Sequence, residues 1–244
     1  GNENNLGYCS ATAQVEPFYS LVEELARIAY EIEGADYHPV GIVNGDRLYV
    51  GLDTFRSQDV NLPHVDFWGS NVYPGETFGT WFDDFALRSG KPVLVTEYGI
   101  DALDDETKQE YEMVQAQYDV SQWREIAAAA NALGATVMAY SDEWWKAGQP
   151  ASHDFGGYAT NRHPDGYSNE EWWGIVRVEP GADGDVDIVT PRQVYYALAR
   201  EFVTLGDMDG NGVLDSSDRD AFGLALTDSV AYSVLYPYGD PLIS

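Results

Sequence analysis

KPVLVTEYG (91–99) is the stretch of sequence that decides the fold. Its apolar residues run on without polar alternation and include β-branched valines, which is typical of a strand covered on both faces, as in a parallel sheet flanked by helices. The run ends at a carboxylate, Glu97, followed by Tyr98 and Gly99. This stretch therefore predicts both a buried parallel strand and an acidic group at its end.

The segments around this strand alternate between helical and extended patterns. Helical spacing of apolar residues runs from Glu16 to a stop signal at Gly34 and recurs over 77–90, 105–134 and 190–202, whereas 38–44, 65–75 and 135–145 predict strands. Such alternation predicts a parallel sheet wrapped by helices. A doubly wound sheet and a (β/α)₈ barrel both fit, and barrel enzymes place acidic residues at the ends of several strands.

Composition limits the class of protein. The 244 residues are 44% hydrophobic, which is enough to build the core of one or two domains. The 41 Asp and Glu against 13 Lys and Arg give a net charge of -28, which repels phosphate backbones and excludes nucleic acid as a partner. No apolar run approaches the roughly 20 residues of a membrane span. Cys9 is the single cysteine, so no internal disulfide forms.

Acidic and aromatic residues follow several of the predicted strands. Glu3 ends the first, Tyr73 the third, Glu97 the fourth, and Trp144 and Trp145 the fifth. Two carboxyl groups at such an edge can split a glycosidic bond, one donating a proton to the leaving oxygen and the other attacking the anomeric carbon. The alternative is that each Glu is a solvated residue or a helix-cap partner.

Two of these motifs resemble those of a known enzyme clan. GNENN (1–5) resembles the Asn-Glu motif that ends the fourth barrel strand in clan A retaining glycoside hydrolases, and PVLVTEYG looks like that clan's nucleophile motif ending the seventh strand. Together with TEYGIDAL (96–103), the wording is closest to the family 2 catalytic domain, which includes β-galactosidases and β-glucuronidases. Two predicted strands lie between the motifs and one follows them, as positions five, six and eight require.

The resemblance implies roles for individual residues. It makes Glu3 the general acid/base and Glu97 the nucleophile, with no cofactor needed for catalysis. It makes Asn2 a ligand of the sugar 2-hydroxyl, Tyr73 the phenol that hydrogen-bonds the nucleophile, and Trp144 the aromatic floor after the eighth strand.

Further aromatic residues are candidates for sugar contacts. Trp68 and Trp145 lie near the predicted strand ends, and Trp172 and Trp173 lie in the long loop 153–176. Long structured loops at this face of a barrel commonly shape the substrate cleft. The alternative for Trp172 and Trp173 is that they pack the loop against the barrel.

The resemblance covers about residues 1–203 and lacks barrel strands one to three and most of strand four. It implies the C-terminal half of a TIM barrel, with about strands four to eight in this chain. Half a barrel leaves sheet edges unpaired and part of its core uncovered. We therefore expect an N-terminal half in a longer chain, another copy or a second chain to complete the barrel.

Residues 204–244 form a second predicted unit, a small helical module read as truncated. GDMDGNGVLDSSDRDAF (206–222) resembles a dockerin repeat, with oxygen ligands at positions 1, 3, 5, 9 and 12 of an EF-hand-type loop and Gly212 at position 6. The expected calcium ligands are Asp207, Asp209, Asn211, Asp215 and Asp218. The alternative is an acidic turn without metal. A dockerin-like module implies a cohesin-like scaffold as partner, and the alternative is a spacer stabilised by calcium.

These features predict a secreted or cell-surface retaining β-glycosidase that acts on a polysaccharide or oligosaccharide and binds structural Ca²⁺. Two other functions stay open. One is a non-catalytic carbohydrate-binding or structural protein built from a barrel remnant, and the other is transglycosylation by the same two carboxylates.

Overall fold

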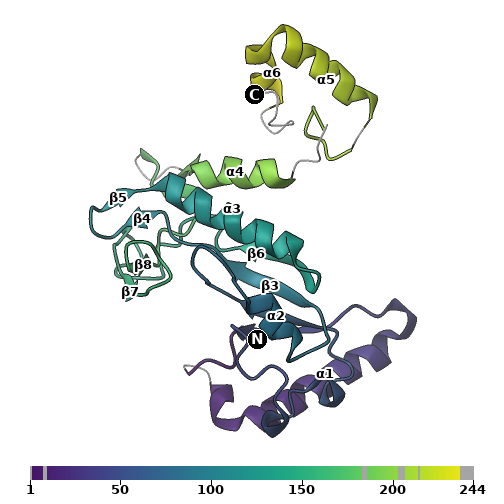
Figure 1. Ribbon diagram of the computed structural model, residues 1–244. Helices are drawn as coiled ribbons and strands as arrows, with labels where there is room; N and C mark the ends of the chain where they lie inside the picture. Colours follow the sequence, from purple (N-terminus) through teal and green to yellow (C-terminus); the bar gives the residue numbers. More distant parts are fainter. Residues whose placement is uncertain (1, 8–9, 183–185, 203–206, 214, 237–244) are drawn as a thin grey trace.

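The computed structural model describes residues 2–7, 10–182, 186–202, 207–213 and 215–236 (Figure 1). Its centre is a parallel sheet of four strands in the order β1 (Gly41–Gly45), β2 (Phe67–Asn71), β3 (Val93–Tyr98) and β6 (Ala132–Val137). The four strands keep their chain order across the sheet, and helices lie between them in the sequence. The predicted α/β architecture with a parallel sheet is confirmed for this part of the chain.

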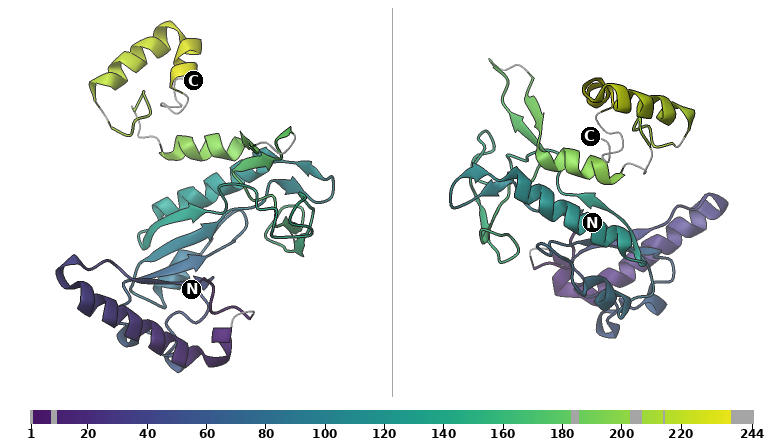
Figure 2. Two further views of the ribbon diagram at one scale, coloured as in Figure 1. Left: turned by 180° about the vertical axis from the view of Figure 1, so that it is seen from behind. Right: turned by 45° about the horizontal axis from the view of Figure 1, so that its top comes forward.

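One apolar core joins the sheet to three helices. These are α1 (Val15–Glu33), α2 (Trp81–Ala86) and α3 (Glu112–Ala128). Fully buried Tyr19 of α1, Phe85 of α2 and Ile126 of α3 belong to the same cluster as Trp68 and Val93 of the sheet. The helix α4 (Gln193–Phe202) lies beside α3 at the β6 edge of the sheet (Figures 1 and 2).

Three short antiparallel hairpins extend from this body. They are β4 (Leu103–Asp104) with β5 (Gln109–Glu110), β7 (Gly157–Ala159) with β8 (Tyr167–Asn169), and β9 (Val176–Glu179) with β10 (Ile188–Pro191). The first two lie side by side (Figure 1), where Asn169 Nδ2 donates to Asp105 Oδ1 at 3.1 Å.

Three predicted helices are longer than the observed ones. The helix expected over 77–90 is confined to α2, Trp81–Ala86. The other two are shortened because strand pairing overrides local helical pattern. The helix expected over 105–134 is shorter: the β4–β5 hairpin precedes α3, and Ala132 already pairs with Val93 in the sheet. The helix expected from 190 begins at Gln193, because Thr190 and Pro191 pair with Arg177 and Val176 in the β9–β10 hairpin.

The helices α5 (Ser216–Thr227) and α6 (Ser229–Leu235) have a small core of their own, formed by Met208, Ala221, Ala225 and Tyr232. Asp215 caps α5, and its side chain accepts a hydrogen bond from Ser217 N. The predicted division between 203 and 204 falls outside the described residues, as does Cys9, and the two-unit organisation stays a prediction. Among the described residues, none of the helices is both long and apolar enough to cross a membrane.

Candidate active site

A cavity of about 430 Å³ lies where the sheet strands end. The strands are parallel, so their carboxyl ends share one edge, and Tyr73 after β2, Glu97 near the end of β3 and Met138 after β6 all meet there. The cavity is lined by Asn2, Glu3, Leu6, Tyr73, Glu97, Met138, Lys146, Tyr158, Ser168, Glu170 and Trp173. Five of the residues predicted from the sequence are thus brought together, namely Asn2, Glu3, Tyr73, Glu97 and Trp173.

Glu97 is held by its backbone and by Tyr73. Its carbonyl oxygen accepts a hydrogen bond from Val72 N at 2.8 Å, and its Oε2 accepts one from Tyr73 Oη at 2.5 Å. Burial above all, and then the negative charges of Glu97 and Glu3, raise the pKa of the Tyr73 phenol. Tyr73 therefore stays protonated and acts as a hydrogen-bond donor to the Glu97 carboxylate.

The wall beside Glu97 is closely packed. The ring of Trp173, only 5% exposed, meets Tyr73 edge to face with centroids 4.9 Å apart. Met138 Sδ lies 3.0 Å from Tyr73 Oη, and the His163 ring lies 5.2 Å from that of Trp173 between centroids. These contacts restrict the orientation of Tyr73 and, through it, of Glu97.

Glu3 reaches the cavity from a turn, whereas the sequence predicts the end of a strand. Residues 2–7 form bends and turns. Buried Asn5 fastens this turn to the end of β1: its Nδ2 donates to Gly45 O at 2.8 Å and its Oδ1 accepts from Gly45 N at 2.7 Å. Asn2 Oδ1 accepts from Asn71 Nδ2 at the end of β2, at 3.1 Å. The side-chain amides of Asn5 and Asn2 therefore hold Glu3 at the cavity in place of the expected strand pairing.

Trp68 was expected to contact substrate and instead lies in the core. Its side chain is fully buried and meets Tyr19 of α1 edge to face, with centroids 5.8 Å apart. Successive side chains of a strand point to opposite faces of the sheet. Trp68 points to the face that α1 covers, and it therefore packs in the core and does not line the cavity.

The tryptophans Trp144, Trp145 and Trp172 also lie outside the lining of the cavity. The His153 ring stacks between Trp144 and Trp172, at centroid distances of 5.3 Å and 3.6 Å. Trp145 is 65% exposed. Trp172 thus packs within the loop, as in the alternative to sugar binding given in the sequence analysis. Its neighbour Trp173 lines the cavity.

Several lining residues were missed by sequence reasoning. The β7–β8 hairpin contributes Tyr158 and Ser168, and Glu170 follows it directly. Lys146 also lines the cavity, where its Nζ pairs with Glu143 Oε2 at 3.0 Å. The length and polar composition of the loop 153–176 pointed to this segment, but nothing in the sequence indicated which side chains turn inward.

A buried charge pair supports the segment that carries Trp173. The Arg192 guanidinium, 1% exposed, donates to both carboxylate oxygens of Asp142 at 2.6 Å and 2.8 Å and to Gly174 O at 2.6 Å. Gly174 N in turn donates to Asp142 Oδ1 at 3.0 Å. A Cβ atom on Gly174 would lie 2.3 Å from Asp142 N, so only glycine permits this close approach of the two segments.

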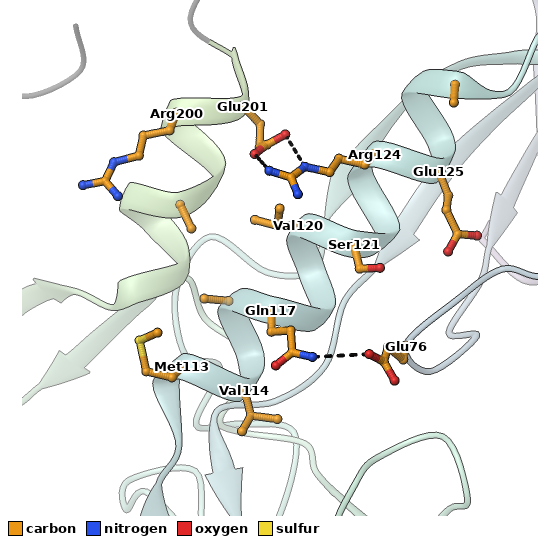
Figure 3. Close-up of a pocket in the computed structure, with 13 residues that line it drawn as sticks. Glu76, Met113, Val114, Gln117, Val120, Ser121, Arg124, Glu125, Arg200 and Glu201 are labelled. Carbon is orange, nitrogen blue, oxygen red and sulfur yellow. Dashed lines mark hydrogen bonds and ion pairs between the residues drawn. The ribbon is translucent and has the colours of Figure 1, made fainter. Parts of the chain in front are cut away.

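A second hollow, of about 940 Å³, lies between α3 and α4 (Figure 3). Apolar side chains such as Met113 and Val120 line it, and Arg124 of α3 donates to both carboxylate oxygens of Glu201 on α4, at 2.9 Å and 2.6 Å. None of the residues predicted to act in catalysis lines this hollow.

Three of the five predicted calcium ligands converge. Carboxylate oxygens of Asp207, Asp209 and Asp218 lie within 4.8 Å of one another. Backbone N–H groups, that of Asp215 first among them, lower the pKa of the Asp218 carboxyl. The other two predicted ligands lie outside this set of three: Asn211 Nδ2 donates to Asp209 Oδ2 of the set, and Asp215 caps α5. Three converging carboxylates are a donor set that suits a hard cation such as Ca²⁺.

Comparisons with known proteins give matches only among solved structures. No protein-family model matches the chain, and neither does any curated protein. An active-site mutant of a β-1,3-glucanosyltransferase from Rhizomucor miehei, in complex with laminaritriose, is 12% identical with a TM-score of 0.44, over 72% of this chain and 57% of that one. A GH2 β-galacturonidase from Eisenbergiella tayi is 16% identical with a TM-score of 0.46, over 81% of this chain and 31% of that one.

A β-glucuronidase from Bifidobacterium dentium is 20% identical with a TM-score of 0.43, over 74% of this chain and 26% of that one. This chain therefore spans between about a quarter and rather more than half of the length of these proteins. Likenesses at these identities and TM-scores assign neither a family nor an activity to this chain.

Proposed function

We propose that this chain is a retaining β-glycosidase, with Glu97 as nucleophile and Glu3 as general acid/base. The observation that carries the proposal is the Glu97 carboxylate held by Tyr73 at 2.5 Å in a cavity that Glu3 also lines. Strand order supports a barrel around this site: the order β1-β2-β3-β6 has no reversal, whereas a doubly wound sheet reverses at its switch point.

In the first step of the proposed reaction, a Glu97 oxygen attacks the anomeric carbon and the bond to the leaving oxygen breaks. Glu3 donates its proton to that oxygen, and a glycosyl ester on Glu97 remains. Tyr73 keeps Glu97 in place before the attack, and the edge-to-face contact of Trp173 keeps Tyr73 in place. Holding the reacting atoms in position lowers the barrier by avoiding the entropic cost of orienting them.

In the second step, a hydroxyl oxygen bonds to the anomeric carbon and the ester bond to Glu97 breaks. The hydroxyl proton passes to the Glu3 carboxylate, which restores both side chains. Water as the acceptor gives hydrolysis, and a sugar hydroxyl gives transglycosylation. The same residues serve both outcomes.

A covalent label tests this assignment. Incubation with 2-deoxy-2-fluoro-β-D-glycosyl fluorides of glucose, galactose, mannose and glucuronic acid, followed by peptide mass spectrometry, is expected to place a fluorosugar on Glu97. Glu97→Gln should remove the label. Glu179→Gln, at an exposed position on β9, is the matched control and should leave labelling unchanged. A label on another residue, or on none, would overturn the assignment, and absence of any label would favour a non-catalytic carbohydrate-binding or structural protein.

We also propose that Asp207, Asp209 and Asp218 bind Ca²⁺ in a structural role, and that the protein acts outside the cell, attached to a scaffold or cell surface. Support for the first point is the convergence of the three carboxylates at the start of α5. Extracellular calcium sites of this type bind at millimolar concentrations, which suits a secreted protein.

A further inference from the structure

The two ends of the cavity differ in their surroundings. Glu97 lies against a wall formed by Tyr73, Met138 and Trp173, of which Trp173 is buried and the other two are half-buried. Tyr158 of the β7–β8 hairpin also lines the cavity and is 49% exposed, so it forms part of the open rim. The glycosyl group that is transferred to Glu97 and the leaving group that departs from it are therefore expected to contact different parts of the cavity.

Tyr158 lies within the electrostatic influence of the acidic groups of the cavity. Burial is the main cause that raises the pKa of its phenol, and the negative charges of Glu170 and Glu3 raise it further. The phenol is consequently neutral at the pH of the cell surface, and Tyr158 lines the same cavity as Glu3.

We propose that Tyr158 is the platform for the leaving group in the first step and for the sugar or aryl acceptor in the second. This inference rests on the proposed function, because it takes Glu3 as the acid/base. The acid/base must touch the oxygen that departs, so the leaving group lies on the side of Glu3. A half-exposed tyrosine offers a ring face for stacking and a polar edge for water, which suits a sugar or aryl ring.

The hairpin holds this platform firmly. Tyr158 pairs with Ser168 across the two strands, and buried Asn169 donates from Nδ2 to Phe155 O at 2.9 Å. A Cβ atom on Gly157 would lie 1.7 Å from Ser168 O, so the two strands approach more closely than any other residue at 157 allows. A platform fixed in advance loses little entropy when a ring stacks on it.

The acceptor step isolates this role from the chemistry at Glu97. Enzyme labelled by whichever fluorosugar reacts is freed of excess reagent, and the recovery of activity is followed in water alone and with phenyl β-D-glucopyranoside as acceptor. In recovery by acceptor, the acceptor hydroxyl oxygen bonds to the anomeric carbon, the ester bond to Glu97 breaks, and the hydroxyl proton passes to Glu3. The acceptor concentration for half-maximal recovery measures binding at the platform.

Tyr158→Ala is expected to raise that concentration roughly tenfold relative to wild type, as loss of an aromatic contact implies. Tyr158→Phe keeps the ring and should retain the acceptor effect, while Tyr158→Leu keeps apolar bulk without a ring and should lose most of it. Tyr140→Ala, at a 65% exposed tyrosine outside the cavity, is the matched control and should behave as wild type.

The results of these experiments separate the role of Tyr158 from the proposed function. An unchanged half-maximal concentration in Tyr158→Ala and Tyr158→Leu would overturn the platform. Equal slowing of labelling, of recovery in water and of recovery by acceptor would also overturn it, because Tyr158 would then serve the whole cavity. Labelling of Glu97 that persists while the platform fails would leave the proposed function standing, whereas absence of label would remove both.

Discussion

Two arginine–carboxylate pairs in this protein have the same chemistry and different burial. Arg192 and Asp142 are joined by two hydrogen bonds of 2.6 Å and 2.8 Å, with side chains 1% and 0% exposed. Arg124 and Glu201 are joined by two hydrogen bonds of 2.9 Å and 2.6 Å, with side chains 66% and 19% exposed (Figure 3). Asp142→Ala and Glu201→Ala therefore form a matched pair of perturbations.

The expected free energies of unfolding differ severalfold. Removing one partner of a buried pair costs about 3–5 kcal/mol when the remaining charge has no other partner. The low end of this range is expected here, because Arg192 Nε still donates to Glu110 Oε2 at 2.9 Å. An exposed pair contributes about 1 kcal/mol or less, because water and side-chain entropy offset the attraction. At about 2–4 °C per kcal/mol for a domain of this size, Asp142→Ala should lower Tm by about 6–12 °C and Glu201→Ala by about 4 °C at most.

Thermal unfolding followed by far-ultraviolet circular dichroism measures both values. The double variant Asp142→Leu with Arg192→Met removes both charges and should recover part of the lost Tm, since a buried ion pair replaced by apolar side chains of similar size is often neutral. Recovery is incomplete because Gly174 N loses its acceptor, Asp142 Oδ1. Equal losses in Asp142→Ala and Glu201→Ala would refute the reasoning from burial. So would a double variant less stable than Asp142→Ala alone.

Three other changes test the site and the calcium cluster. Tyr73→Phe removes a hydrogen bond to a carboxylate, worth about 1.5–3 kcal/mol, and should slow fluorosugar labelling by about 10- to 150-fold in stopped-time mass spectrometry. Asn5→Ala deletes both bonds to Gly45, and should slow labelling while the far-ultraviolet spectrum keeps its wild-type shape, a loss of that shape counting against a local role. Added CaCl₂ should release heat on binding in titration calorimetry with wild type and not with Asp207→Ala, and identical heats would contradict the assigned ligands.

The sheet could be predicted from the sequence because its strands carry their own signal. The run KPVLVTEYG is apolar without interruption, and β3 occupies Val93–Tyr98 within it. Boundaries set by distant contacts could not be predicted in the same way. The residues of 129–134 continue a helical pattern locally, yet Ala132 leaves it to pair with Val93, a partner almost forty positions earlier.

The residues of the candidate site likewise divide into those placed by local sequence pattern and those placed by contacts with distant residues. Glu97 and Tyr73 follow strand runs directly, so local pattern places them at one edge. Trp68 misled because it lies on a site strand but faces the helix layer, and the sequence near it lacks the polar alternation that would reveal its face. Asn5 carried no signal at all, since its role depends on contact with Gly45 across forty residues.

The backbone segments that carry Glu3 and Glu97 differ in how firmly they are held. Glu97 belongs to an interior strand hydrogen-bonded to neighbours on both sides, whereas Glu3 sits on a short turn fastened by two asparagine amides. Local opening in proteins begins where backbone bonds and apolar contacts are fewest, far below the free energy of global unfolding. Gentle warming should therefore detach the turn while the strands persist, and inactivation would precede melting as a separate, reversible event.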